Sequence, residues 1–244
     1  MNETIQLLTT HVSVRSFENT PLSNTIKEEL IRAASSGSTS NFVQAYSIIE
    51  ITDLELRHTL AELTKNIDHI QQTGAFYVFV ADLHTHATLL EQKGLPTDGV
   101  ETLESLLVAT IDTTIAAQNM VIAAESLGLG VCYIGGMRND LERVRQLLHL
   151  PRHTLPLFGL TIGVPVHKND VKPRKPHKNI VSQNTYQQAQ RTDLAEYDHI
   201  TASYYANRGS SQQQTSWSDK MLDFFSVVRR PEVAEFIKKQ GFNI

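Results

Sequence analysis

The 244-residue sequence predicts a fold of the α+β or α/β class with a helical tail, because strand-like and helix-like segments alternate over its first two thirds. The strand-like segments are short runs of aromatic and β-branched residues, and the helix-like segments repeat apolar residues every three or four positions. The chain is 41% hydrophobic and 20% charged, which is ordinary for a globular protein that buries a core. Its length suits one large domain, or one domain with appendages.

The first predicted elements are a helix, a strand, a helix and a strand. Ser23 is the expected N-cap of the first helix, which ends in a polar stretch at residues 35–41. Residues 46–51 form the first predicted strand. Asp53 begins the second helix, and residues 75–82 form a second strand rich in aromatic and β-branched residues.

One long apolar helix, predicted between Thr102 and Gly128, dominates the middle of the chain. Its acidic and amide residues make it too polar for a lipid-facing span, so we expect it in a core or a subunit interface, with no membrane partner. A strand at 131–135, a helix capped at 139–140 and a buried strand at 155–165 follow.

The composition changes after Pro165. Residues 167–178 hold five Lys/Arg residues against one acid, and their prolines exclude a helix interior. Beyond them we predict a helix ending at Gly209, a flexible polar link at 209–216 and two short helices, the second begun by Pro231.

Composition also excludes several classes of function. The net charge of −4 argues against nucleic acid as a partner. The N-terminus has neither the basic leader nor the apolar run of a signal peptide, so a cytoplasmic location is expected. Cys132 is the single cysteine, which leaves no internal disulfide or thiolate zinc site, and its burial in a strand should raise the thiol pKa.

Three polar patches are candidates for binding. In HVSVRSF (residues 11–17) the polar residues alternate with apolar ones and so share one face of an extended segment. The Ser-rich stretch 35–41 with Gln44 could contact an anion or a polar heterocycle edge. Lys172 and Arg174, on a proline-stiffened loop, could clamp a phosphate. Each patch, taken alone, also fits an ordinary solvated loop.

Taken together, these segments resemble the flavin-dependent nitroreductase family, and most closely its larger, NADPH-preferring branch of oxygen-insensitive nitroreductases and flavin reductases. The likeness is carried in order by HVSVRSF, the Ser-rich loop leading to NFVQAYSIIEITD, AAESLGLGVCYIGGMRND, LPLFGLTIGVP, KPR at 172–174 and YYANRGSSQQQTSWSD. The resemblance implies an α+β nitroreductase-like fold, with a central mixed, mostly antiparallel sheet flanked by helices and a helical C-terminal arm, in a homodimer. It implies an FMN-binding core at 1–190 and, within the same domain, a helical extension at 191–244 that belongs to the cofactor and dimer region.

The resemblance also implies an FMN-containing NAD(P)H oxidoreductase. Such an enzyme transfers hydride from NADPH through tightly bound FMN to small acceptors, namely nitroaromatics, quinones or flavins, by a ping-pong mechanism. The flavin does the chemistry, so no acid–base residue and no metal is expected. The implied cofactor-binding residues are His11, Ser13, Arg15, Thr39, Gln44, Tyr133, Ile134, Gly135, Gly136, Lys172 and Arg174, and the NADPH-binding residues are Arg208 and Arg230.

Within that set, the resemblance gives particular roles to the arginine and the two glycines. Arg15 would face the end of the flavin ring where reduction builds negative charge. Gly135 and Gly136 would lie against the ring, because a side chain there would push it away. His11, Lys172 and Arg174 would hold the phosphate, with Ser13 and Thr39 as hydroxyl partners.

Two positions depart from the family pattern. Ile67 stands where a glutamine commonly touches the flavin, so that contact is lost or is replaced by a neighbour such as Gln71. Gln213 stands where a further NADPH-binding arginine is expected. The missing positive charge should weaken binding of the 2′-phosphate and so make the preference for NADPH over NADH smaller.

Two other functions fit parts of the sequence. His84 and His86 follow a strand, as in some metal-dependent amidohydrolases, and both could reach a metal from an extended segment. A non-catalytic flavin-binding protein is the second alternative, because flavin enzymes need few catalytic side chains.

Overall fold

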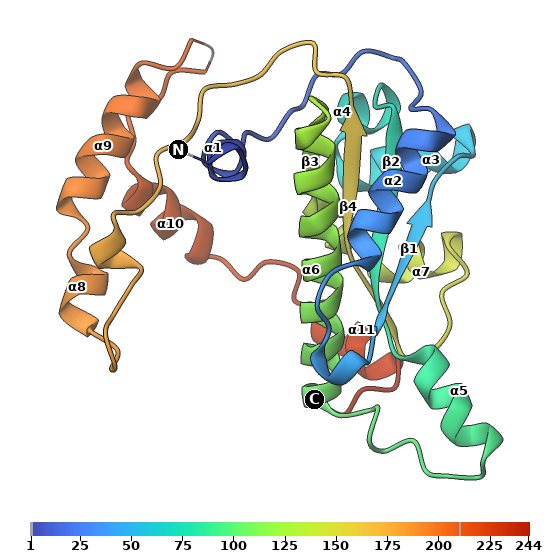
Figure 1. Ribbon diagram of the computed structural model, residues 1–244. Coiled ribbons are helices and arrows are strands. Elements are labelled where there is room, and N and C mark those ends of the chain that lie inside the picture. Colours follow the sequence, from blue (N-terminus) through green and yellow to red (C-terminus); the bar gives the residue numbers. More distant parts are fainter. Residues whose placement is uncertain (1, 210) are drawn as a thin grey trace. The chain divides into compact units, whose positions relative to one another are not determined.

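The computed structural model describes residues 2–209 and 211–244, which form two compact units (Figure 1). Unit 1 comprises Met1–Asn169 and Arg230–Ile244, and unit 2 comprises Asp170–Arg229. The predicted functional division between residues 1–190 and 191–244 stays a prediction, because these units are defined by packing alone.

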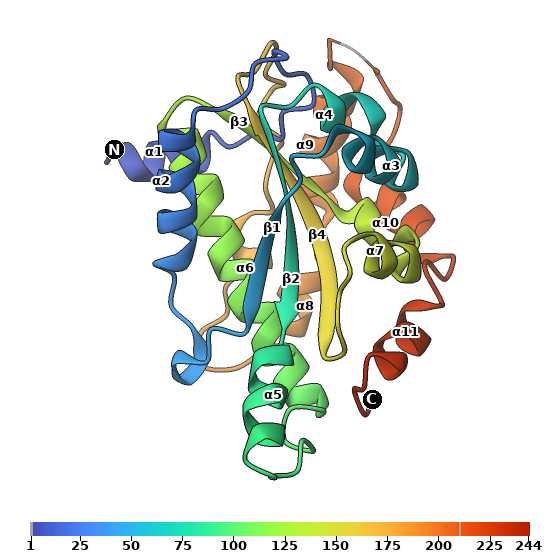
Figure 2. The same cartoon turned by 90° about the vertical axis from the view of Figure 1, so that its right-hand side faces the viewer.

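Unit 1 is built on a four-stranded sheet with the strand order β1-β2-β4-β3 (Figure 2). Its neighbouring strands all pair antiparallel, and a parallel bridge joins Ser13 to Val131 of the last strand in this order. The predicted α+β fold with a mostly antiparallel sheet is therefore confirmed. Its four strands are also confirmed, and they are β1 (Tyr46–Glu50), β2 (Ala75–Asp82), β3 (Gly130–Ile134) and β4 (Thr154–Gly163).

Helices cover both faces of the sheet (Figure 2). Tyr77 and Phe79 of β2 enter the core on one face, and Phe76 and Val78 enter the core on the other. Because β2 is buried on both faces, its sequence is a continuous apolar run without polar alternation. The first face is covered by α2 (Asn24–Ser35) and α6 (Leu103–Ser126), and the second by α3 (Leu54–Thr64), α4 (Ile67–Gln71) and α7 (Leu141–Leu147).

The predicted helix starts agree closely with the structure. Ser23, Asp53 and Asp140 are the N-caps of α2, α3 and α7, and each side chain accepts a backbone N–H from the first turn of its helix. The sequence did not predict α4 or the other short helices α1 (Glu3–Thr9), α5 (His84–Gln92) and α8 (Gln188–Thr192).

The three helices predicted near the C-terminus are present, with small shifts. The first, α9 (Ala195–Ala206), ends before Gly209, and the side-chain amide of its C-cap residue Asn207 donates to the carbonyl of Ser203 at 2.9 Å. The other two are α10 (Trp217–Phe225) and α11 (Val233–Lys239), and α11 begins two residues after Pro231.

The long helix α6 lies in the core of unit 1. By length and apolar composition it is a candidate membrane span, but nine of its residues are buried in the unit, and several of them join α2 and the sheet in one core cluster. The predicted core position is confirmed.

A buried carboxylate on α6 fixes the loop that leads into β1. Asp112 is fully buried, and its two oxygens accept the backbone N–H groups of Ser40 at 3.0 Å and Ala45 at 3.2 Å. Between these contacts Asn41, Phe42 and Gln44 adopt left-handed backbone conformations, which non-glycine residues rarely do. Asp112 therefore holds a strained loop in one conformation.

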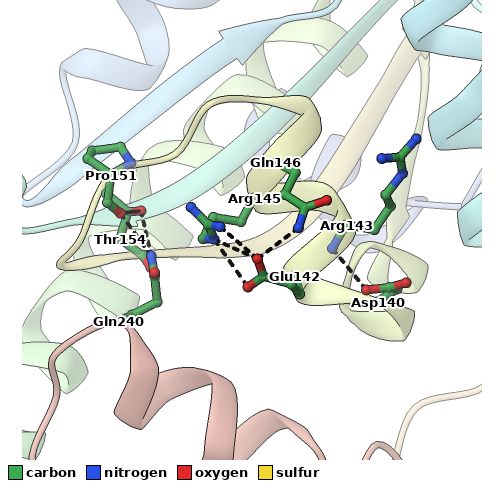
Figure 3. Close-up of polar contacts among 8 residues, drawn as sticks. All are labelled: Asp140, Glu142, Arg143, Arg145, Gln146, Pro151, Thr154 and Gln240. Carbon is green, nitrogen blue, oxygen red and sulfur yellow. Dashed lines mark hydrogen bonds and ion pairs between the residues drawn. The ribbon is translucent and has the colours of Figure 1, made fainter.

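A buried amide fixes the C-terminal segment to the sheet, as Figure 3 shows. Gln240 follows α11, and its side-chain nitrogen donates to the carbonyls of Pro151 at 2.9 Å and Thr154 at 2.7 Å. Phe236 and Phe242 pack on either side of it into the core with Leu155. The end of the chain thus belongs to unit 1.

We expect Asp112→Ala to destabilise the protein strongly. The change leaves two backbone N–H groups without their acceptor, and each buried unsatisfied group costs about 1–3 kcal/mol. Asp112→Asn keeps one oxygen acceptor and should cost less. The free energy of unfolding, measured by chemical denaturation, tests this order. Glu104→Ala, at an exposed acid on the same helix, is the control and should lose about 1 kcal/mol at most. Equal losses for Asp112→Ala and Glu104→Ala would contradict the assignment.

Candidate functional site

The segment 11–17 runs beside β3 and carries the first group of predicted site residues. The Nδ1 atom of His11 lies 2.6 Å from the Oε1 atom of Glu125 on α6. Ser13 forms the parallel bridge to Val131, and the next residue, Val14, is buried and donates its N–H to Val131 O at 2.8 Å. The imidazole of His11 is therefore oriented by a carboxylate, and Ser13 is fixed against the edge strand.

Arg15 is exposed, and its charge acts on two neighbouring elements. Burial lowers the pKa of His69 on α4, and the Arg15 charge lowers it further. Burial raises the pKa of the Cys132 thiol on β3, while Arg15 opposes that shift. The raised pKa supports the expectation that Cys132 is a poor nucleophile. Arg15 thus acts electrostatically on residues of both β3 and α4.

Tyr133 and Ile134 end the edge strand β3. Ile134 is buried, whereas the Tyr133 ring packs edge-on against Phe158 with its hydroxyl 3.3 Å from the side-chain oxygen of Gln118. Burial and, secondarily, the charge of Glu125 raise the pKa of Tyr133 to about 12. The hydroxyl therefore stays protonated at neutral pH and remains a hydrogen-bond donor.

Gly135 and Gly136 begin the 3₁₀ turn η2 (Gly135–Asn139), and they face different surroundings. A Cβ atom at Gly136 would lie 2.5 Å from the carbonyl oxygen of Thr64, at the end of α3. A Cβ atom at Gly135 would meet only the Nη2 atom of Arg138, at 3.5 Å. Close packing on α3 by itself accounts for the absence of a side chain at Gly136. At Gly135 no such packing exists, so only the space needed by a ligand explains the glycine there.

Two arginines surround this turn. Arg138 donates from Nη1 to the carbonyl of Leu157, and burial lowers its pKa, as does the nearby charge of Arg230. Arg230, in a left-handed backbone conformation, donates from Nε and Nη2 to Oδ1 of Asn139 at 3.1 and 2.9 Å. The structure therefore places Arg230, predicted to bind NADPH, against the last residue of η2, the turn that follows β3. Arg138 lies within the segment GGMRND, but the sequence pattern alone did not single it out.

Thr39 and Gln44 lie on the loop that Asp112 holds. Thr39 precedes the 3₁₀ turn η1 (Ser40–Phe42) and is half-buried. Gln44 is exposed, with a left-handed φ of 55°. Strained backbone of this kind is often found at binding sites, where the surrounding structure holds it in place.

Helix α4 begins at Ile67, the residue that stands where the family commonly has a glutamine. Gln71, the predicted replacement, has its side-chain amide hydrogen-bonded to Nδ1 of His58 on α3. His69 was not singled out from the sequence, yet its Nδ1 is buried without a hydrogen-bond partner among the described residues. Residues 65–69, with Glu62, line an open pocket of about 520 Å³. His69 is therefore another candidate for the missing polar contact, and only its tertiary surroundings reveal it.

In unit 2, Lys172 and Arg174 are exposed on the proline-rich segment. The hydroxyl of Tyr197 donates to the carbonyl of Pro173, between them, at 3.0 Å. Burial raises the pKa of Tyr197, and the charge of Arg174 opposes that shift. Helix α9 thus fixes the backbone of the KPR segment.

Arg208 and Gln213 lie in the segment that follows α9. The guanidinium carbon of Arg208 lies 5.8 Å from the ring centre of Tyr204. Gln213 donates its backbone N–H to the carbonyl of Tyr205 at 3.0 Å, and its side-chain oxygen accepts a hydrogen bond from Lys220 at 2.7 Å. Lys220 is thus a further cation near this link, and no sequence motif singles it out.

The metal-site alternative at His84 and His86 is wrong. These residues lie in the first turn of α5, where residues two positions apart do not face each other, and not in an extended segment. His86 has its Nε2 atom 3.0 Å from the carbonyl oxygen of Val43. Within residues 2–209 and 211–244 there is no group of three or more His, Cys, Asp or Glu residues arranged to hold a metal ion.

We predict opposite tolerances for alanine at the two glycines. Gly136→Ala forces a methyl group against the backbone of Thr64, and overpacking of this kind costs about 1–3 kcal/mol. Gly135→Ala should leave the free energy of unfolding of the FMN-free protein nearly unchanged. Thermal and chemical unfolding of the two variants test this directly. A Gly136→Ala variant as stable as Gly135→Ala would show that the turn adjusts easily.

Comparison with known proteins covers nearly the whole chain. The model of the nitroreductase family matches residues 8–164, and that of the nitroreductase family C-terminal domain matches residues 172–244. The chain is 43% identical over 242 residues to an oxygen-insensitive NADPH nitroreductase of Salmonella typhimurium, and 40% identical over 247 residues to an FMN reductase (NADPH) of Bacillus subtilis. These alignments cover 99–100% of this chain and 99% of each relative.

A solved structure agrees with these matches. NfrA1 of B. megaterium superimposes with a TM-score of 0.95 at 40% identity, covering 100% of both chains. Family models, relatives and fold all agree. The chain therefore belongs to the nitroreductase family, in its NADPH-preferring branch.

Proposed function

We propose that this protein is an FMN-containing, NADPH-dependent oxidoreductase that reduces small acceptors such as nitroaromatics, quinones or flavins. The relatives named as an NADPH nitroreductase and as an FMN reductase, which align over nearly their whole lengths, support this activity. The observation that carries the proposal is the exposed cation of Arg15. This residue directly follows Val14, which is hydrogen-bonded to Val131 of β3, and β3 leads into the open backbone of Gly135.

The residues of unit 1 fit one end of a flavin ring. Gly135 has no side chain, and even a Cβ there would meet only Arg138, so a flat ligand can approach its backbone closely. Arg15 offers an exposed positive charge, which would stabilise negative charge on a bound ring. Thr39 and Gln44, on the loop held by Asp112, offer polar contacts from another element.

We assign the FMN phosphate to His11, Ser13, Lys172 and Arg174. In unit 1, Glu125 orients the imidazole of His11 through Nδ1, which leaves Nε2 free. In the imidazolium form Nε2 carries a proton and can donate it to a phosphate oxygen. In unit 2, the KPR segment supplies a guanidinium fork and an ammonium, and both suit phosphate oxygens.

When bound, FMN supplies the ring that accepts hydride from NADPH and passes the electrons to the acceptor. The chain itself binds and orients the reactants, stabilises charge through Arg15 and limits the access of water. We propose that Arg208 and Arg230 bind NADPH. No side chain is assigned as a general acid or base.

We also propose that the protein works as a homodimer in the cytoplasm. Leu103, Leu107 and Ile111 of α6 are spaced four residues apart and are each about half exposed, with 48–55% of their surface accessible. A row of large apolar side chains on one helix face is typical of a subunit interface.

Steady-state kinetics with FMN-loaded protein test the proposed function. NADPH should be consumed only when an acceptor such as a quinone or a nitroaromatic is present, and NADH should be a poorer donor. A protein that retains FMN but consumes neither donor with any acceptor would support the alternative of a non-catalytic flavin-binding protein.

We predict that Arg174→Ala weakens FMN retention much more than it lowers turnover at saturating FMN. One charge-assisted phosphate contact is worth about 1.5–3 kcal/mol, whereas the phosphate is remote from the reacting ring. Fluorescence titration of the FMN-free protein measures the dissociation constant. As a control, Lys178→Ala removes a cation already paired with Glu196 at 2.9 Å, and it should bind FMN as the parent does. If both variants bind alike, Arg174 does not hold the phosphate.

Arg208→Ala should raise the KM for NADPH about tenfold or more, which is the loss of one charge-assisted contact to the 2′-phosphate. The KM for NADH should hardly change, because NADH has no phosphate there. Parallel measurements with both donors separate the two effects. If the KM values for NADPH and NADH rise equally, Arg208 stabilises the packing of α9 through its contact with Tyr204 and does not select the donor.

A further inference from the structure

Unit 2 carries two cations on a pair of tyrosine rings at the end of α9. Arg208 lies over Tyr204 as described above, and the ammonium nitrogen of Lys220 lies 4.8 Å from the ring centre of Tyr205. The two rings meet edge to face, with their centroids 5.4 Å apart. Two positive charges are thus held on adjoining aromatic surfaces.

Neither charge is neutralised by a carboxylate within the part of the chain that the structure describes. Lys178, in the same unit, shows the contrast, since it pairs with Glu196 at 2.9 Å and Asp193 at 3.6 Å. A cation held in place without an anionic partner is available to an anionic ligand.

Lys220 is tied to the position where the family pattern lacks its arginine. Its ammonium donates to the side-chain oxygen of Gln213 at 2.7 Å, and the backbone N–H of Gln213 donates to the carbonyl of Tyr205 at 3.0 Å. The amide is neutral, so this contact positions the ammonium without cancelling its charge. Two of the three ammonium donors remain for other acceptors.

We propose that Lys220 is a specificity-determining residue that binds the 2′-phosphate of NADPH together with Arg208, and that it supplies the positive charge that Gln213 lacks. A phosphate monoester carries nearly two negative charges at neutral pH, which suits one guanidinium fork and one ammonium. The inference rests on the proposed use of NADPH. It implies that the preference for NADPH is not narrowed by the absence of an arginine at 213.

The proposal is tested by measuring the dissociation constants of NADP⁺ and NAD⁺ for the purified, FMN-loaded protein at low and at high salt. Lys220→Ala should weaken NADP⁺ binding about tenfold, equivalent to about 1.4 kcal/mol, and leave NAD⁺ binding unchanged. The salt dependence of NADP⁺ binding should also become shallower, because one screened ion pair is lost.

A conservative variant, a rescue and a control complete the experiment. Lys220→Arg should retain most of the NADP⁺ affinity, and Gln213→Arg should restore it in the Lys220→Ala background by returning a charge to the same place. Lys178→Ala should alter neither ligand, because it removes an already paired cation.

The results distinguish a failure of the role of Lys220 from a failure of the proposed NADPH preference. If the parent prefers NADP⁺ and Lys220→Ala keeps that preference, or weakens both ligands equally, the role of Lys220 is overturned while the proposed function stands. If the parent binds NADP⁺ and NAD⁺ alike, the proposed NADPH preference fails, and the inference fails with it.

Discussion

The carboxylate of Asp112 is the constraint on which the arrangement of unit 1 depends. It lies in the middle of α6, fully buried, and is satisfied only because the backbone N–H groups of Ser40 and Ala45 reach it. A buried charge without such partners would be very costly, so the helix and the loop must fold together. The loop then enters β1 at Tyr46, whose pKa is raised by burial and by Asp112.

The same constraint positions candidate ligands of the cofactor. Residues between the two anchored N–H groups take left-handed conformations, which a free loop would relax. The backbone at Gln44 therefore has a fixed direction without being part of a regular element, and Thr39 directly precedes the anchored Ser40. Near the C-terminal end of α6, Glu125 orients His11 in a similar way. The long helix thus organises both polar segments around the sheet through two of its acidic side chains.

Much of the fold could be predicted because its signals are local. Asp53 and Asp140 cap the helices that they were expected to cap, and β2 has the composition of a strand buried on both faces. The histidines of α5 were misjudged, although a local signal existed, since Asp82 accepts the N–H of His84 at 2.9 Å as a helix begins there. The short helices lack sustained periodicity, and tertiary packing decides them.

The candidate site was less predictable, because its details depend on neighbours that are distant in sequence. The glycine at 136 is explained by Thr64, and the isolated Nδ1 of His69 is evident only once α4 is packed in place. Likewise, no sequence pattern connects Lys220 with Gln213, seven residues earlier and before the start of α10. Family resemblance supplied the expected roles, and the structure supplied the contacts that modify them.

The most direct test of the central claim is the amount of flavin that the purified protein carries. The protein should be yellow, and denaturation should release about one FMN per chain, quantified by its absorbance against the protein concentration. A colourless protein that remains colourless after incubation with FMN and removal of the excess would contradict the account.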